Sequence, residues 1–313
     1  MLKILSFLVI FAVATSHQWG LLTASQQQSL AQLVTQPERL KTQAELPGQA
    51  TDRTSLQTVA LPVRIPGHSS LVLPVRSAIA IDQVTGTVLY EQAADTQLPI
   101  ASLTKLATAL VTLAHYQPTD IITIPPLPPY QAADARAGLV PGDHFTVQQL
   151  IAALLIPSAN DAADALAISQ SGSITDFAEA QNAKLASWGI AATHLSNASG
   201  LTDDNNYSTA RDLSKIANLV LESTLIRETI GQSSAAITSQ EGRSYQLQTT
   251  NQLLSTKEFH GIKTGYTAAA GQCYIGLASI NGHEVITVVL GAADRFGNTK
   301  TLTDWITSSW QWL

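Results

Sequence analysis

The chain has 313 residues, of which 45% are hydrophobic and 13% are charged, and its formal net charge is −6. This length allows one large domain or two ordinary ones with a substantial apolar core. The acidic balance argues against nucleic acid as a partner, because nucleic acid selects basic surfaces. A single cysteine, Cys273, excludes an intramolecular disulfide and a thiolate metal cluster, and the seven histidines are scattered along the chain. We therefore expect no bound metal and no cofactor.

The first 22 residues indicate export. Lys3 precedes the apolar run ILSFLVIFAVA, which ends in small residues at Ala12 and Ala14, a pattern typical of a secretory signal peptide. The run is too short to span a bilayer unless it extends into the residues that follow, so the alternative is an uncleaved N-terminal membrane anchor. We expect the protein outside the cytoplasm of a bacterium, in the periplasm or at the outer face of the membrane, since the lack of disulfides argues against a eukaryotic secretory route.

Residues 23–70 differ in composition from the rest of the chain. They are rich in Gln, Ser, Thr and Pro, and no aromatic residue occurs between Trp19 and Tyr90. A segment without large apolar side chains cannot offset the entropy that it loses on ordering. We predict a flexible linker over 23–70 and one compact domain over 71–313.

The compact domain begins with two predicted strands, 77–81 and 87–91, joined by a turn that contains glycine. A helix follows over about 100–115, and the proline-rich stretch PPLPPY after it predicts a surface loop.

Four further helices are predicted in the middle of the chain. The first, 146–156, starts at a capping box of Thr146 and Gln149 and ends before a proline, which disfavours helical geometry in the residue before it. In the last of the four, Thr209 and Asp212 form a second capping box. The helices after the first cover 161–169, 176–189 and 208–223.

The end of the chain predicts a hairpin and a final helix. Asn281–Gly282 lies between two apolar runs within 271–291, which is the strongest short-range signal for a hairpin. A helix is predicted over 298–312. Strands at both ends of the domain with helices between them predict an α+β fold, in which an antiparallel sheet flanked by helices joins remote segments and a mostly helical lobe is added.

The helix over 100–115 carries the first candidate for chemistry. Ser102 and Lys105 are three residues apart, so their side chains share one helix face. A serine hydroxyl becomes a good nucleophile when a nearby base takes its proton, and a lysine serves as that base when burial or a neighbouring cation lowers its pKa. The N–H of Ser102, at a helix N-terminus, is suited to bind an oxyanion. The alternative is a serine near a helix start followed by a solvated lysine, but this is the only Ser-x-x-Lys in the chain.

Two more short motifs follow along the chain. Ser158 and Asn160 lie in a break between two predicted helices, where a hydroxyl relays a proton and an amide holds a substrate amide. Lys263, Thr264 and Gly265 enter a predicted strand, where a cation and a hydroxyl bind a carboxylate and the glycine admits a substrate strand. Taken alone, each motif is also compatible with an ordinary turn.

In this order the three motifs, Ser-x-x-Lys, Ser-x-Asn and Lys-Thr-Gly, resemble those of the penicillin-recognising serine enzymes. More narrowly, the chain resembles the low-molecular-weight penicillin-binding proteins, the serine-type D-alanyl-D-alanine carboxypeptidases of peptidase family S11, in the β-lactamase/transpeptidase-like superfamily. The wider matches cover about residues 76–313 and include GLVPGDHFTVQQLIAALLIPSANDAADALA, HLSNASGLTDDNNYSTARDLSKIA and GIKTGYTAAAGQC.

The resemblance implies a reaction. The substrates are peptidoglycan stem peptides that end in D-Ala-D-Ala, and the terminal D-alanine is removed. Ser102 attacks the carbonyl between the two D-alanines with Lys105 as general base, which gives an acyl-enzyme. Ser158 shuttles the proton to the leaving amine. The same serine binds β-lactam antibiotics covalently.

The resemblance also implies binding roles. Asn160 holds the peptide, and Lys263 with Thr264 takes the terminal carboxylate. The oxyanion lies between the backbone N–H groups of Ser102 and Tyr266. Family members often carry histidine at the position of Tyr266, but only the backbone amide is needed there, so the change bears on substrate fit. Arg295 is a candidate to assist with the carboxylate, although a plain surface arginine is the favoured interpretation.

Three alternatives stay open. A class A β-lactamase needs an added glutamate to activate the deacylating water, and this chain has no glutamate from 180 through 221, so we expect slow hydrolysis of a penicillin adduct. A D-alanyl-D-alanine endopeptidase cuts the cross-link instead of the free end. A non-catalytic module that binds the wall or senses β-lactams keeps the cleft without the activity.

Many relatives add a β-rich C-terminal domain and an amphipathic anchoring helix, and the chain ends too soon after Lys263 for either. We expect any membrane attachment at the N-terminus. Trp305, Trp310 and Trp312 are expected to pack the last helix on the sheet, because the segment lacks the basic face of an interfacial helix. Cys273 is interpreted as a small strand residue.

Overall fold

A computed structural model describes residues 59–201 and 203–313. The predicted signal peptide or anchor, 1–22, and residues 23–58 of the predicted linker lie outside the described residues. Among the residues described, none of the helices is both long enough and apolar enough to cross a membrane.

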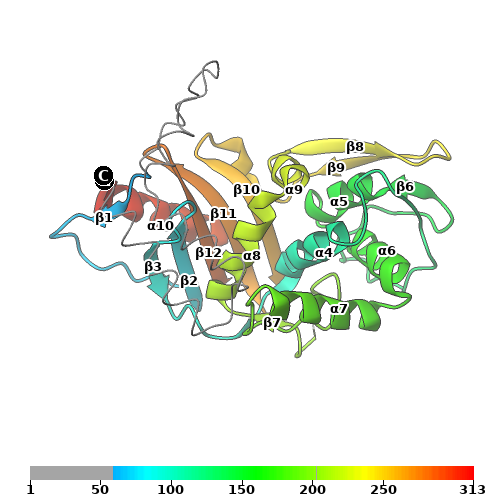
Figure 1. Cartoon of the computed structure of the whole chain (residues 1–313), viewed down its shortest axis with the longest axis horizontal. Helices are drawn as coiled ribbons and strands as arrows, with labels where there is room; N and C mark the ends of the chain where they lie inside the picture. Colours follow the sequence, from blue (N-terminus) through cyan, green and yellow to red (C-terminus); the bar gives the residue numbers. More distant parts are fainter. Residues whose placement is uncertain (1–58, 202) are drawn as a thin grey trace, which may run out of the picture. The chain divides into compact units, whose positions relative to one another are not determined.

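A five-stranded antiparallel sheet organises the described unit, in the strand order β10-β11-β12-β2-β3 (Figure 1). Strand β2 from the start of the unit pairs with β12 from its end, so the sheet joins remote segments and the predicted α+β fold is confirmed. Strand β10 is left at an edge of the sheet. The five strands are β2 (Ser77–Asp82), β3 (Val88–Gln92), β10 (Phe259–Thr267), β11 (Gly271–Ile280) and β12 (His283–Ala292).

Helices cover both faces of this sheet. Successive side chains of a strand point to opposite faces, so Ala78 and Ala80 pack in one hydrophobic cluster while Ile79 packs in another. Helix α10 (Arg295–Ser309) covers the first face by contacting β11 and β12, and helix α8 (Ala210–Glu222) covers the second by contacting β12 and β2. Both faces of the sheet are therefore buried against helices.

A helical lobe forms around α4, which contacts α5, α6, α7 and α8. Eight of the ten residues of α4 are buried, as expected for a helix that is apolar on all sides. The Ser-x-x-Lys motif therefore starts in the centre of the molecule. The helices of the lobe are α4 (Thr104–Leu113), α5 (Val147–Leu155), α6 (Asn160–Ser171), α7 (Ile174–Ser187) and α9 (Thr224–Ile230).

Short strands pair as β1–β13, β4–β7, β5–β6 and β8–β9, and the β8–β9 hairpin extends past β6 in Figure 1. Two short 3₁₀ helices, η1 and η2, flank the edge strand β10. These elements are β1 (Pro62–Arg64), β4 (Leu98–Pro99), η1 (Ala101–Leu103), β5 (Ile121–Thr123), β6 (His144–Thr146), β7 (Tyr207–Ser208), β8 (Ser234–Thr238), β9 (Ser244–Gln248), η2 (Gln252–Ser255) and β13 (Trp310–Trp312).

Two local predictions are confirmed in detail. Helix α5 starts with the capping box of Thr146 and Gln149, each accepting a hydrogen bond from the backbone of the other. Asn281 and Gly282 form the two-residue turn between β11 and β12, with φ of 51° and 84°. Both central residues have positive φ, which is the geometry that an Asn-Gly hairpin turn requires.

Only one of the two hydrogen bonds of the second predicted capping box is formed. The Thr209 hydroxyl accepts the Asp212 N–H at 3.0 Å, but the Asp212 carboxylate accepts from the Ala192 N–H at 2.8 Å and from Lys215 at 2.9 Å. A distant backbone group and a neighbouring cation outcompete the N-cap N–H, because the acid lies where the chain before α8 packs against it.

The final helix is displaced from its predicted range of 298–312. Helix α10 starts at Arg295, capped by the Asp294 side chain, and ends at Ser309, after which residues 310–312 form β13. Strand β13 pairs with β1, so the folded unit starts at Val59 rather than at the predicted residue 71. Pairing with a remote partner overrides the helical pattern at the end of the chain.

The tryptophans nevertheless pack on the body of the unit, as expected. The Trp312 ring stacks on His283 at 4.8 Å between centroids, and its Nε1 donates to Asp82 at 2.8 Å. The Trp305 ring meets the edge of Tyr90 at 5.7 Å. Cys273 is fully buried on β11, where burial raises the pKa of its thiol to about 11, so the interpretation as an inert strand residue agrees with its surroundings.

Candidate active site

Ser102 lies in the 3₁₀ turn η1 that leads into α4. Ala101 before it adopts a left-handed conformation with φ of 50°, which costs about 1 kcal/mol or more for a residue other than glycine. This turn brings Ser102 to the edge strand β10, with its side chain half-buried. The strained backbone at Ala101 thus directly precedes Ser102, the candidate nucleophile, and helps to orient its side chain.

Lys105 is fully buried one turn further along α4. Its Nζ lies 3.0 Å from Ser102 Oγ, 2.7 Å from Asn160 Oδ1 and 2.5 Å from the carbonyl oxygen of Ser199. The i, i+3 prediction for the pair on one helix face is confirmed by the first of these distances.

The three contacts of Lys105 fit both of its protonation states. As an ammonium, Nζ donates to the oxygens of Ser102, Asn160 and Ser199. As a neutral amine, Nζ still donates to the oxygens of Asn160 and Ser199, which only accept, and its lone pair faces the Ser102 hydroxyl. That is the arrangement in which a base receives the proton of a serine.

Burial supplies the reason for a neutral amine. Loss of water lowers the pKa of Lys105 to about 7, against the raising effect of the carboxylates of Asp164, Asp161 and Asp134. A lysine with a pKa near neutrality is in large part a free base at physiological pH. The desolvation that Lys105 needs for base chemistry is therefore present.

Ser158 and Asn160 lie where α6 begins. Ser158 is 5% exposed and left-handed, with φ of 64°. Asn160 was predicted in the break between helices and is instead the first residue of α6, because Ala159 takes the cap position. Among the described residues the Ser158 hydroxyl makes no hydrogen bond, whereas the Asn160 amide binds Lys105.

Lys263 brings a second buried amine from β10. It is 1% exposed, and its Nζ donates to the Thr264 carbonyl oxygen at 3.0 Å. Burial, and then the charges of Lys105 and Arg295, hold its pKa well below the usual value. Within the described ranges neither amine forms an ion pair, so an anion placed between them gains two partners.

Thr264 and Gly265 complete the edge of β10. The Thr264 hydroxyl lies 2.5 Å from that of Thr250. A Cβ on Gly265 would lie 3.0 Å from the Ile100 carbonyl oxygen and 3.2 Å from the Ser102 nitrogen. The close approach that the structure shows at this glycine is made by the chain's own backbone around Ser102, and approach of a substrate strand stays a prediction.

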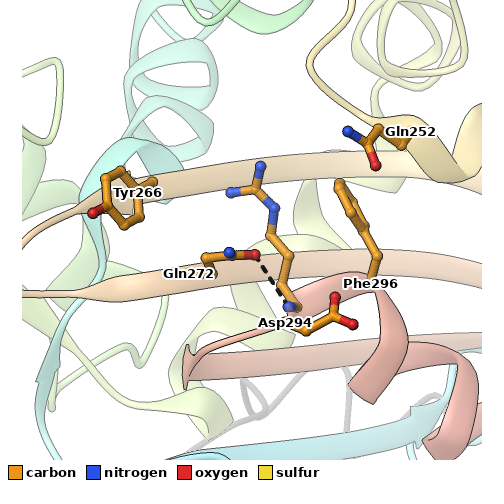
Figure 2. A pocket seen from close by; sticks show the side chains of 6 residues that line it. Gln252, Tyr266, Gln272, Asp294 and Phe296 are labelled. Atoms are coloured by element: carbon orange, nitrogen blue, oxygen red, sulfur yellow. Dashed lines mark hydrogen bonds between the residues drawn. The ribbon is translucent and has the colours of Figure 1, made fainter.

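The interpretation of Arg295 as a plain surface arginine is wrong. Arg295 reaches from the start of α10 to β10, where its Nη1 donates to the Gly265 carbonyl oxygen at 2.9 Å. Its buried Nε has no hydrogen-bond partner among the residues that the structure describes. It lines a pocket of about 490 Å³ next to β10, which we name the Arg295 pocket (Figure 2). The pocket is lined by Gln252, Tyr266, Gln272, Asp294, Arg295 and Phe296.

Comparisons with known proteins agree with the fold. A model of the D-alanyl-D-alanine carboxypeptidases, Peptidase_S11, matches residues 68–294. The chain belongs to this family of serine-type D-Ala-D-Ala peptidases. The family includes D-alanyl-D-alanine carboxypeptidases from Streptomyces sp. strain K15, 33% identical over 68% of this chain and 79% of the relative, and from Bacillus subtilis (DacF), 30% identical over 72% and 59%. The chain thus spans less than two thirds of the Bacillus relative.

Other S11 relatives carry a different activity in their names. A D-alanyl-D-alanine endopeptidase of Pseudomonas aeruginosa is 31% identical over 74% of this chain and 76% of the relative. The crystal structure of the Streptomyces K15 DD-transpeptidase matches with a TM-score of 0.69 and 28% identity, over 77% of this chain and all of that chain. At this level of identity the family is shared by proteins with several related activities.

Four contact residues were missed by the sequence analysis: Ser199, Thr250, Tyr130 and Asp164. Ser199 offers its carbonyl oxygen to Lys105 from 94 residues away. Asp164 lies one turn after Asn160 on α6 and accepts the Tyr130 hydroxyl at 2.7 Å. Ser199 and Asp164 both lie in segments quoted for the family likeness, but the sequence analysis gave neither a role. Within the described residues no cluster of His, Cys, Asp or Glu is arranged to hold a metal.

Proposed function

We propose that the protein is a serine D-alanyl-D-alanine peptidase that acts on peptidoglycan stem peptides and releases the residue after D-alanine through an acyl-enzyme on Ser102. The contact that supports this most directly is the 3.0 Å distance from Lys105 Nζ to Ser102 Oγ, at a fully buried amine whose pKa is about 7. With a terminal D-alanine as leaving residue the activity is that of a carboxypeptidase.

The proposed reaction has two acyl-transfer steps. Lys105 takes the hydroxyl proton while Ser102 Oγ attacks the carbonyl carbon of the first D-alanine, and the backbone N–H groups of Ser102 and Tyr266 bind the oxyanion. The C–N bond then breaks, and the amine leaves with a proton relayed through Ser158. Water hydrolyses the ester and regenerates the hydroxyl.

The free edge of β10 and its neighbours bind the substrate in this proposal. The Asn160 amide holds the peptide, and the leaving carboxylate lies among Lys263, Thr264 and Arg295. Two cations without ion pairs among the described residues support this placement, because charge-assisted hydrogen bonds to a carboxylate are stronger than neutral ones. The bound anion also supplies the counter-charge that Lys263 lacks.

A β-lactam acylates the same serine in this proposal, and the adduct persists. The proposed site of action is outside the cytoplasm, where the wall peptides are, in agreement with the predicted export signal. Attachment of the N-terminus to the membrane is part of the same proposal.

The test is D-alanine release from a soluble pentapeptide that ends in D-Ala-D-Ala, combined with mass mapping of a penicillin adduct. The expected results are release of D-alanine, an adduct on Ser102, and loss of both in Ser102→Ala, whereas the exposed Ser187→Ala on α7 keeps both. An adduct without release supports the non-catalytic sensor, rapid turnover of penicillin supports a β-lactamase, and release that survives Ser102→Ala contradicts the proposal.

A further inference from the structure

Helix α6, which begins with Asn160, has no side chain that caps its first turn. Ala159 occupies the N-cap position and makes no side-chain hydrogen bond to the helix, although the first N–H groups of a helix need partners from outside it. The Asn160 N–H instead donates to the carbonyl oxygen of Ala135 at 2.8 Å. Residues 135–139 thus take the place of an N-cap for α6, and we name them the capping segment.

Asp161 binds the capping segment to the helix. It is 2% exposed, and its carboxylate accepts three successive backbone N–H groups of the segment, from Ala137 at 3.0 Å, Gly138 at 2.7 Å and Leu139 at 3.0 Å. The N–H of Ala162, in α6 itself, donates to the same carboxylate at 3.0 Å. Four donors use the acceptor capacity of a carboxylate, so Asp161 is fully occupied in holding backbone.

Asn160 connects these contacts to the candidate base. Its backbone N–H is held by the capping segment, while its side-chain oxygen accepts from Lys105 Nζ at 2.7 Å. Asp161 is the next residue along the chain, so the carboxylate and the Ala135 carbonyl hold the same turn of helix. Release of the capping segment removes the acceptor of the Asn160 N–H and frees Asn160 to shift relative to Lys105.

We propose that Asp161 is a positioning residue for the reaction at Ser102, because it binds the capping segment to the start of α6 and thereby fixes Asn160 against Lys105. The inference rests on the proposed function, in which Asn160 holds the peptide and Lys105 is the base. Asp161 acts through Asn160 and takes no part in the transfer of protons.

The test is the rate of acylation by penicillin in Asp161→Asn, measured at a pH above the pKa of Lys105. The amine is then neutral in both proteins, so the lost charge does not alter the base. The asparagine amide places N–H donors where a carboxylate oxygen accepted them. We expect a loss of about ten- to a hundredfold, since a misplacement of about 1 Å has an effect of up to this size. An unchanged rate overturns the inference.

Asp176→Asn is the matched control for this variant. Asp176 is also an acid in the first turn of a helix, α7, but it is exposed. We expect Asp176→Asn to keep the wild-type rate, because no capping segment depends on it. The same loss in both variants overturns the inference, since it would follow from any change of charge at a helix start.

A double-mutant cycle with Asn160→Ala distinguishes positioning from a general loss of structure. If Asp161 acts through Asn160, Asp161→Asn has little further effect once the Asn160 side chain is absent. The rate losses of the two single variants then do not multiply in the double variant, as expected for coupled residues. Losses that multiply in full overturn the positioning role.

Ala137→Pro tests the same contact from the capping segment, and it does so even if Asp161→Asn does not fold. Proline has no backbone N–H, so one of the three bonds from the segment to Asp161 is lost, and we expect a smaller loss of the same rate. Ala132→Pro is the control, at the second position of the exposed turn over 131–134, where proline is favoured. A wild-type rate in Ala137→Pro, or an equal loss in Ala132→Pro, overturns the inference.

The wild-type protein separates this inference from the proposed function. If wild type forms the penicillin adduct on Ser102 and releases D-alanine, but Asp161→Asn does both at the same rate, the positioning role alone fails. If wild type cleaves no peptide and forms no adduct, the proposed function fails and the inference fails with it.

Discussion

Asp164 is a buried carboxylate whose charge acts on Lys105, the candidate general base. It lies four residues after Asn160 on α6, so the two side chains share the helix face that looks toward Lys105. Its carboxylate is 3% exposed and accepts the Tyr130 hydroxyl at 2.7 Å. Burial raises the pKa of Asp164 to about 6. A charged Asp164 favours the protonated form of Lys105 and thereby opposes its use as a base.

Asp164→Asn tests this opposition. Removal of the negative charge lowers the pKa of Lys105, so the acid limb of the pH profile for acylation by penicillin moves to lower pH, by about 0.5–1 unit. Asp161 and Asp134 still face the amine and retain part of the effect. Asp304→Asn, at an exposed position of α10, is the matched control and leaves the limb in place. An unchanged or upward-shifted limb in Asp164→Asn contradicts the role assigned to it.

For single residues of the site, the sequence predicts contacts between partners that are close along the chain. Ser102 and Lys105 are linked by helix geometry, which fixes their shared face. The Ser199 carbonyl and Thr250 hydroxyl carry no such signal, because they reach the site only after loops from other parts of the chain have packed. Arg295 was weighed as a surface residue because nothing near it in sequence marks the approach of α10 to β10.

Gly200 holds the loop that supplies the Ser199 carbonyl. Its φ is 79°, and a Cβ there would lie 2.0 Å from the Ala101 carbonyl oxygen and 2.9 Å from the Ser102 nitrogen. A backbone group cannot move aside as a flexible side chain does. The loop and the turn η1 are therefore in contact through a position that only glycine can occupy.

Gly200→Ala is expected to lower the rate of acylation by penicillin at least about a hundredfold, since a misplacement of about 1 Å at a reacting group has an effect of this size. Gly172→Ala is the matched control, because Gly172 also has a left-handed φ of 82° but nothing within 4 Å of a Cβ. Gly172→Ala is expected to lower stability by about 1–2 kcal/mol and to keep the acylation rate. Equal rates in the two variants contradict the contact.

Features of helices and strands that depend on neighbouring residues are predicted from the sequence, whereas features that depend on remote partners are not. The Thr146 capping box and the Asn281–Gly282 turn are local, and the structure shows both as predicted. The end of α10 and the fate of Asp212 depend on remote partners, β1 in one case and Ala192 in the other. A local pattern cannot indicate these partners.

Two buried amines link the stability of the whole molecule to pH. The unfolded chain holds a proton on Lys105 up to about pH 10.5, whereas the native pKa is about 7. Between these values the unfolded state binds more protons, so the free energy of unfolding rises with pH, by up to about 1.4 kcal/mol per unit for each such amine. Lys263 acts in the same direction.

Lys105→Met removes one of these amines with little change in volume. We expect the free energy of unfolding, measured by urea denaturation at several pH values from neutral to alkaline, to rise less steeply with pH in Lys105→Met than in wild type. The exposed Lys300→Met on α10 keeps the wild-type slope. Identical slopes in Lys105→Met and wild type contradict a native pKa near neutrality.

For the whole molecule, the sequence predicted the α+β class and the sheet between remote segments. It placed the start of the folded unit too late, because residues 62–64 have the composition of a linker and form β1 only by pairing with β13. Their order comes from a partner at the far end of the chain rather than from apolar side chains of their own.

The most direct test of the account is the pH dependence of the rate at which wild type is acylated by penicillin. If burial makes Lys105 the base, the rate rises with pH through an acid limb whose apparent pKa is about 7. A rate that is constant across neutral pH, or a limb at the usual pKa of lysine, about 10.4, contradicts the claim that a neutral Lys105 activates Ser102.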